Sequence, residues 1–260
     1  MCMEQQAKAS ELILESWQSG VKIPILDENI RPQTRLDGYA IQAHVEQLST
    51  QPLIGWKIAA TSAAGQVHIG LDGPIAGRLL AERQIRTGEN CSLSANTMRV
   101  AEAEFSFKMA RDLPPRDAHY LVDEVMEAVG AMHLSIEIPD SRFEDFAAVG
   151  ADQLIADNAC AHDFYIGQEC ENWRDTDLSG QAVTGKTASQ NKQGAGANVL
   201  GDPRTALTWL VNELSQMGIT LKTGQFVMTG TSTDPVPVEP GDEFVADFGP
   251  LGRVGVQFSE

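Results

Sequence analysis

Apolar residues recur at helical spacing near the start of the chain. In KASELILESWQSG they fall at Leu12, Ile13 and Trp17, which is the stripe of an amphipathic helix. Ser10 is a suitable N-cap and Gly20 a suitable stop for this helix. The pattern therefore predicts a first helix that ends before Pro24.

The same spacing appears in three later segments. DGYAIQAHVEQLS, residues 37–49, predicts a second helix, and residues from about 122 to 129 predict a short one. GDPRTALTWLVNELSQMG, residues 201–218, predicts a long helix, because Pro203 suits its first turn and Gly218 its C-terminal end. These helices are isolated and do not alternate regularly with strands.

Strand patterns fill most of the remaining sequence. GWKIAAT (55–61) reads as a short buried strand, TMRVAEAEFSFKMAR (97–111) alternates like a strand, and another strand ends at Pro139. The Gly-rich centre of residues 181–201 suits a hairpin, and residues 224–258 form short strands between Pro, Gly and Asp turns. We predict one α+β domain over residues 1–260, with a rolled or sandwiched sheet and a helical part, about 1–50, packed on it.

Composition removes several functional classes. A formal charge of −17, from 36 acidic and 19 basic residues, disfavours a nucleic-acid partner, which needs clustered Lys and Arg. No apolar run approaches the roughly 20 residues that span a bilayer, and MCMEQQAKAS lacks the order of a secretion signal. We therefore expect a cytoplasmic protein. The cysteines lack CxxC spacing and the histidines lack HExxH, so neither sequence pattern indicates a zinc site.

Two acids in an apolar strand are the first candidates for chemistry. Glu102 and Glu104 in AEAEFSFKMAR project from the same face of a strand, since side chains two apart share a face. Taken alone, such a pair is typical of a half-exposed strand with a wet face. LSIEIPDSR, however, places Glu137 between two isoleucines. If the two strands pair, three carboxylates converge.

Three converging carboxylates need a partner that offsets their repulsion. Their clustering in an apolar setting costs several kcal/mol unless they share protons or a cation, and oxygen ligands are those that Mg²⁺ or Mn²⁺ prefers. The acids therefore predict a divalent metal site. An octahedral ion with three protein ligands would keep about three positions for water or substrate.

Lys57 is the other candidate. It lies between Trp56 and Ile58 in GWKIAATS. Such a lysine is either a surface residue with a buried stem or, beside an anionic site, a proton donor or electrostatic clamp. Both interpretations are open from the residues alone.

Several segments together resemble the 2-keto-4-pentenoate hydratase family, within the fumarylacetoacetate hydrolase superfamily. The matching segments are RLDGYAIQ, GWKIAATS, AEAEFSF, LSIEIPDSR, GDPRTALTWLVNEL and TGTSTDPVPVEPGDEFVADFGPLGRVGVQF. The resemblance implies a mixed β-roll in a homo-oligomer, with Glu102, Glu104 and Glu137 as metal ligands and Lys57 as the active-site lysine. It also implies small 2-oxo or 2-hydroxydienoic acid substrates from aromatic catabolism, with Mg²⁺ or Mn²⁺ as cofactor.

Three hydroxyl residues complete the predicted site. By the same resemblance, Thr231 and Ser232 lie where the family places donors near the substrate carboxylate, and Ser62 follows the lysine strand closely. Each is equally suited to satisfy its own turn. Arg142 is expected to pair with a neighbouring acid.

One departure from the family leaves the reaction open. Hydratases of this family commonly carry an acid in a Pro–Asp–aromatic–Gly turn, whereas DGPIAGRLL has Ile75 and Ala76 there, with Asp72 displaced. We expect a metal-dependent lyase of the hydratase type. Decarboxylation, tautomerisation or C–C hydrolysis of a 2-oxo acid are alternatives, as is a non-catalytic accessory subunit.

Overall fold

The computed structural model describes residues 1–49 and 51–260, in which helices and strands are mixed. The helices are α1 (Met3–Ser19), α2 (Arg35–Leu48), α3 (Ala63–His68), α4 (Val122–Glu127), α5 (Ala151–Ala156) and α6 (Pro203–Gln216). The strands are β1 (Leu53–Ala59), β2 (Ile75–Leu80), β3 (Cys91–Ser92), β4 (Val100–Met109), β5 (Val129–Ile138), β6 (Asp163–Glu169), β7 (Ala182–Lys186), β8 (Asn191–Ala195), β9 (Phe226–Thr231), β10 (Val236–Pro237), β11 (Glu243–Asp247) and β12 (Arg253–Ser259).

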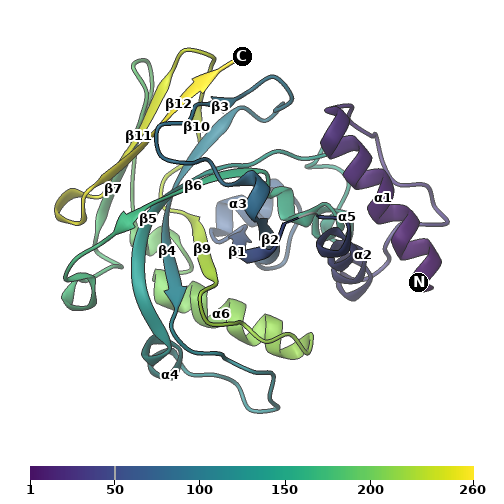
Figure 1. The fold of residues 1–260 in the computed structure, drawn as a ribbon, viewed down its shortest axis with the longest axis horizontal. Helices are drawn as coiled ribbons and strands as arrows, with labels where there is room; N and C mark the ends of the chain where they lie inside the picture. Colours follow the sequence, from purple (N-terminus) through teal and green to yellow (C-terminus); the bar gives the residue numbers. More distant parts are fainter. Residues whose placement is uncertain (50) are drawn as a thin grey trace.

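The strands form two mixed sheets. The larger has the order β2-β1-β9-β4-β5-β6, with β10 paired to β4, and the smaller has the order β3-β12-β11-β7-β8. Most pairs are antiparallel, but β1 runs parallel to β9 and β12 parallel to β3. Figure 1 shows β4 and β5 as long curved strands, with α1, α2 and α5 on one side and the smaller sheet on the other. The predicted α+β fold with a rolled sheet is confirmed.

A continuous apolar core joins the two sheets and α6. The Phe105 ring from β4 meets the Phe248 ring edge to face, with centroids 5.0 Å apart, an arrangement that aromatic quadrupoles favour. Because alternate residues of β4 enter this core, Glu102 and Glu104 share a different face from Ala103 and Phe105. The core thus fixes the direction in which the acids point.

Helices α1 and α2 dock through buried polar contacts as well as apolar ones. The Trp17 indole of α1 donates to His162 Nδ1 at 2.7 Å. The Gln42 amide of α2 donates to the carbonyls of Ala76 at 2.9 Å and Ile155 at 2.8 Å. These bonds join the N-terminal helices to β2, to α5 and to the segment that follows α5.

One local prediction was wrong, and two were confirmed. Helix α1 begins at Met3, with Cys2 at the N-cap position, and Ser10 is buried inside it; the preceding residues are good helix formers and extend the helix by two turns. The hairpin predicted within residues 181–201 is confirmed as β7–β8, which turns at residues 187–190. The Gly20 stop is confirmed, with a left-handed φ of 73°.

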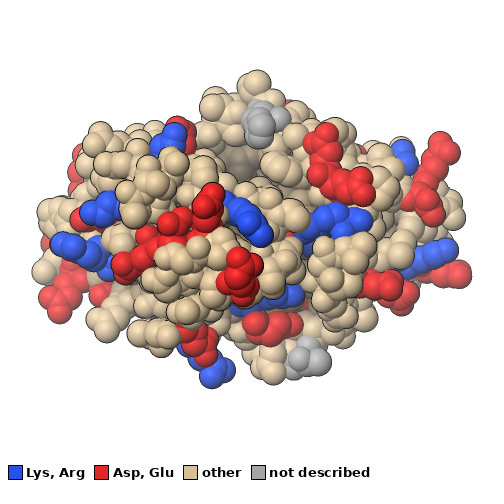
Figure 2. All heavy atoms as spheres, turned by 90° about the horizontal axis from the view of Figure 1, so that it is seen from above, with Lys and Arg blue, Asp and Glu red and all other residues tan. Residues whose placement is uncertain are grey.

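Surface charge is distributed widely. Among the described residues on the face in Figure 2, Lys and Arg stand singly or in small groups between Asp and Glu. No helix in the described part of the chain combines the length and the apolar character that crossing a membrane requires.

Candidate metal centre and active site

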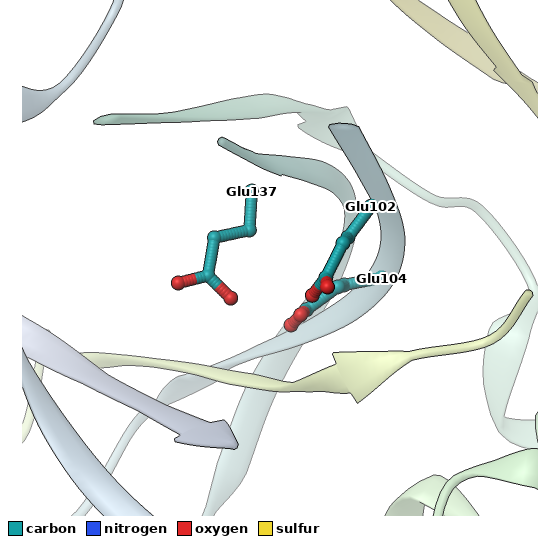
Figure 3. Close-up of side chains that lie close together, drawn as sticks. All are labelled: Glu102, Glu104 and Glu137. Carbon is teal, nitrogen blue, oxygen red and sulfur yellow. The ribbon is translucent and has the colours of Figure 1, made fainter. Parts of the chain in front are cut away.

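Strand pairing brings the three glutamates together. In the antiparallel β4–β5 ladder Glu102 lies directly opposite Glu137, and Glu104 lies on the same face of β4, two residues along. Ligand atoms from the three carboxylates all lie within 4.8 Å of one another. Figure 3 shows the three side chains converging from the two strands, so the convergence expected from the sequence is confirmed.

The carboxylates are removed from water to different extents. Glu104 is 0% exposed and Glu137 is 1% exposed, whereas Glu102 is half-buried. Desolvation, followed by the charge of Glu137, raises the pKa of Glu102 to about 7 and raises the pKa of Glu104 well above its usual range. A wet outer face therefore does not explain this pair.

Lys57 faces the acids. Its side chain is 3% exposed, its Nζ lies 2.9 Å from Glu137 Oε1, and it donates to the Ala159 carbonyl at 3.0 Å. Burial lowers the pKa of Lys57, but the charges of Glu137, Glu102 and Glu104 outweigh burial and raise it. Lys57 is thus a buried ammonium, and the surface interpretation is wrong.

The curl of the sheet makes this contact short. β1 and β5 are three strand positions apart in the larger sheet, which is roughly 14 Å in a flat sheet. The sheet is not flat, since β4 and β5 are curved in Figure 1, and the long side chains of Lys57 and Glu137 meet at 2.9 Å. The rolled sheet therefore gathers charges that lie far apart in sequence.

Gly230, on β9, binds the carboxylate of Glu104. Its backbone N–H donates to Glu104 Oε2 at 2.9 Å. Gly230 has a φ of 101°, and a Cβ there would lie 2.2 Å from Thr61 Oγ1. Only glycine fits both the conformation and the space, so this residue type fixes the orientation of the Glu104 carboxylate.

The donor set fits a hard divalent cation. Glu104 Oε1 and Glu137 Oε2 are buried and find no hydrogen-bond donor among the described residues. When ionised, three carboxylates beside one ammonium leave two negative charges without compensation. Oxygen ligands and this charge suit Mg²⁺ or Mn²⁺, and unpaired buried carboxylate oxygens are costly without such an ion.

The predicted hydroxyl groups lie in different settings. Ser62 Oγ accepts from the Gly65 N–H at 3.0 Å as the N-cap of α3, and Thr231 Oγ1 donates to the Thr233 carbonyl at 2.8 Å. Thr231 nevertheless stands opposite Glu104 in the β4–β9 ladder. Ser232 Oγ is buried and has no partner among the described residues.

Ile75 and Ala76 occupy the positions where the resemblance led us to expect an acid. β1–β2 pairing places Gly77 opposite Lys57 and Ile75 opposite Ala59, so Ile75 shares the face of Lys57. Ile75 is 1% exposed and Ala76 is fully buried. Asp72 is exposed, and its negative charge contributes to raising the pKa of Arg35. The position is therefore apolar in the fold as well as in the sequence.

Comparison with known proteins identifies the family. A 2-keto-4-pentenoate hydratase of Paraburkholderia xenovorans (strain LB400) is 30% identical over 265 residues, which covers 99% of this chain and 96% of the hydratase. The chain belongs to the 2-keto-4-pentenoate hydratase family. No protein-family model matches the chain.

Solved structures agree with this family assignment. A 4-oxalocrotonate decarboxylase from Pseudomonas putida G7, complexed with magnesium and adipate, superposes with a TM-score of 0.90 at 27% identity, covering 99% of this chain and 98% of the decarboxylase. A fumarylacetoacetate hydrolase family protein from Yersinia pestis CO92 shares the fold with a TM-score of 0.59, at 12% identity and 81% and 95% coverage. The chain is thus similar in sequence to a hydratase and in structure to a decarboxylase.

Sequence reasoning missed the backbone groups of the site. The Ala159 carbonyl and the Gly230 N–H contact Lys57 and Glu104, yet neither depends on a reactive side chain. The Asp157–Asn158 pair was a usable signal, because adjacent Asp and Asn favour turns. The expectation that Arg142 pairs with an acid is confirmed, since its partner is Asp157.

Proposed function

We propose that this chain is a metal-dependent lyase of the hydratase type that acts on a small 2-oxo or 2-hydroxydienoic acid. The observation that carries the proposal is the buried cluster of Glu102, Glu104 and Glu137 with Lys57 beside it. The names of its relatives, a 2-keto-4-pentenoate hydratase and a 4-oxalocrotonate decarboxylase, support this substrate class.

The residues of the site have separate roles in this proposal. The three glutamates would hold Mg²⁺ or Mn²⁺. When bound, the ion supplies a Lewis acid that stabilises negative charge on the C2 oxygen of a 2-oxo acid. Lys57, whose raised pKa keeps it protonated near neutral pH, holds a proton at Nζ for donation to the substrate and stabilises developing negative charge. Ser62, Thr231 and Ser232 are proposed to contact the substrate.

A second candidate reaction is favoured by the apolar position at Ile75. Hydration needs a group that activates water or moves its proton, and Ile75 and Ala76 supply none on the Lys57 face. In a 2-oxo diacid whose second carboxylate is conjugated with the C2 carbonyl, loss of that carboxylate as carbon dioxide leaves its bonding electron pair in an enolate of the same kind, without activation of water. Decarboxylation is therefore the alternative that this substitution supports.

The metal part of the proposal is tested with Glu104→Gln. We expect this variant to lose Mg²⁺ binding and turnover while its circular dichroism spectrum stays unchanged, because Glu104 is fully buried and its Oε1 has no protein partner. Glu127→Gln, on an exposed side chain, is the matched control and should behave like the wild type. Full turnover by Glu104→Gln in the presence of a chelator would refute the proposed site.

The reaction is tested on a panel of 2-oxo and 2-hydroxydienoic acids with the purified chain and Mg²⁺. Loss of dienol absorbance without carbon dioxide release indicates hydration or tautomerisation, carbon dioxide release indicates decarboxylation, and cleavage to two acids indicates C–C hydrolysis. Absence of turnover on every acid would favour an accessory subunit. A single domain, homo-oligomeric assembly and a cytoplasmic location stay predictions; size-exclusion chromatography tests the assembly.

A further inference from the structure

The segment after α5 has an unusual backbone. Asn158, Ala159 and Cys160 follow one another with φ of 54°, 52° and 58°. This left-handed region disfavours residues with a Cβ, although Asn tolerates it better than most. Three such residues in a row persist only when their surroundings hold them in place. The structure shows what holds this turn and what the turn holds.

The Asn158 side chain fastens the turn to β2. Its Oδ1 accepts from the Arg78 N–H at 2.6 Å, and its Nδ2 donates to the Arg78 carbonyl at 2.9 Å. β2 is an outer strand of the larger sheet, so these backbone groups of Arg78 face outward from the ladder. Asn158 thus pairs with the strand edge as a neighbouring strand would, and it is fully buried.

Contacts on both sides leave the turn little freedom. Before it, Asp157 is bound by Arg142, and the Arg142 guanidinium also donates to the Ala161 carbonyl at 2.8 Å. On the sheet side, a Cβ at Gly77 would lie 2.3 Å from the Asn158 carbonyl oxygen. The close approach of turn and strand therefore requires glycine at position 77.

These contacts fix the direction of the Ala159 carbonyl. Ala159, at the middle of the turn, accepts from Lys57 Nζ at 3.0 Å, while the same Nζ lies 2.9 Å from Glu137 Oε1. Gly77 stands opposite Lys57 in the β1–β2 ladder. Asn158 therefore binds β2, which pairs with the strand that carries Lys57. The turn and β2 together enclose the Lys57 ammonium.

We propose that Asn158 is a positioning residue for Lys57: by fastening the turn to β2, it directs the Ala159 carbonyl to hold the ammonium beside Glu137. This inference rests on the proposed function and deepens it, since it assigns the geometry of the lysine to a residue that does not contact substrate. Asn158 acts through the turn, so its loss displaces Lys57 and leaves the three glutamates in place.

Two variants test the role of Asn158. Asn158→Gly deletes both bonds to Arg78 but accepts a positive φ without cost, so its effect reports the bonds and not backbone strain. Asn158→Asp keeps the acceptor for the Arg78 N–H but puts a carboxylate oxygen in place of the donor to the Arg78 carbonyl. Asn172→Gly is the matched control, because Asn172 also has a φ of 54° but is exposed.

Three measurements separate positioning from general stability. The first is the rate of amine labelling of Lys57 with trinitrobenzenesulfonate, quantified by peptide mass spectrometry against the exposed Lys222 of the same molecule. The second is Mg²⁺ binding by calorimetry. The third is kcat and KM on whichever 2-oxo acid the wild-type chain turns over best.

We expect Asn158→Gly to label several times faster at Lys57 and to lose about 10²-fold in kcat, as a misplaced reacting group does. Its Mg²⁺ affinity should stay at the wild-type value. Asn158→Asp should fall between Asn158→Gly and wild type in both labelling and kcat, and Asn172→Gly should match wild type.

Unchanged labelling of Lys57 in both Asn158 variants would overturn the inference, as would a parallel loss of Mg²⁺ affinity and kcat. If the wild-type chain turns over no 2-oxo acid, the proposed function fails. Labelling and calorimetry still decide the role of Asn158 in that case.

Discussion

In the proposed site Glu137 binds both the Lys57 ammonium and the divalent ion. Its Oε1 lies 2.9 Å from Lys57 Nζ, and its Oε2 has no hydrogen-bond partner among the described residues. A divalent ion held by Glu102, Glu104 and Glu137 would therefore lie near the ammonium, and the two like charges repel each other. The site tolerates this repulsion because the carboxylates outnumber the ammonium.

This arrangement predicts opposite effects for two substitutions on metal binding. Lys57→Met should lower kcat by about 10²–10⁴-fold, the range for loss of a proton-transfer group, while Mg²⁺ affinity stays equal or becomes stronger. Glu104→Gln should abolish Mg²⁺ affinity. Calorimetry and steady-state kinetics measure both, with the exposed Lys108→Met as control. Loss of Mg²⁺ binding in Lys57→Met would contradict separate roles.

The side chains of the site were predictable, and their backbone partners were not. Two-residue spacing in a strand was sufficient to place Glu102 and Glu104 together, and register then brought in Glu137. The burial of Lys57 was open, because the same apolar flanks suit a surface lysine. The direction of the Ala159 carbonyl depends on Asn158, which reaches a strand edge 80 positions away in sequence.

Helix α1 is held by a hydrogen bond to His162, and this bond depends on the protonation state of the imidazole. His162 Nδ1 accepts from the Trp17 indole, which requires a lone pair on that nitrogen. Burial, followed by the charges of Arg83, Arg142 and Lys22, lowers the pKa of His162 to about 2. The ordinary value is 6.5, so neutral His162 contributes stability that is present above pH 6.5 and is lost as the pH falls toward 2.

Trp17→Phe should therefore destabilise the protein at neutral pH. The change leaves the buried Nδ1 of His162 without a donor, which costs about 1–3 kcal/mol. Urea unfolding at pH 7.5 measures the loss in the free energy of unfolding. Trp209→Phe, at a half-buried position on α6, is the control and should cost less. Equal effects of the two substitutions would show that the bond to His162 contributes nothing.

Element prediction succeeded where the local signal was strong. Helix α6 begins at Pro203, as expected, and its N-cap is Asp202, whose side chain accepts from the Arg204 N–H. The start of α1 was misplaced because Ser10 has the chemistry of an N-cap, while the good helix formers before it continue the helix back to Met3. A capping residue marks a helix start only where the residues before it do not themselves favour a helix.

At the scale of the whole molecule, the fold concentrates negative charge that is costly without a cation. The metal-free protein must either ionise a buried carboxyl cluster or keep protons on it. Glu102 shows the consequence: its pKa is about 7 in the folded protein, against an ordinary 4.5. Between these values the folded chain binds a proton that the unfolded chain has released, so stability declines as the pH rises through this window.

A divalent ion such as Mg²⁺ should therefore raise the free energy of unfolding more at pH 8 than at pH 6. At pH 8 Glu102 is ionised, so Mg²⁺ binds there without displacing the Glu102 proton, whereas at pH 6 it must displace that proton. Ligand at 100 times its Kd adds about 2.7 kcal/mol, which corresponds to a rise in Tm of roughly 5–11 °C for a chain of this size. Differential scanning calorimetry with Mg²⁺ and with a chelator measures the rise at each pH. Glu102→Gln lacks one of the three proposed ligands and should lose most of the rise at both pH values. A rise that is larger at pH 6 than at pH 8 in the wild type would contradict the linkage between the cluster and the ion.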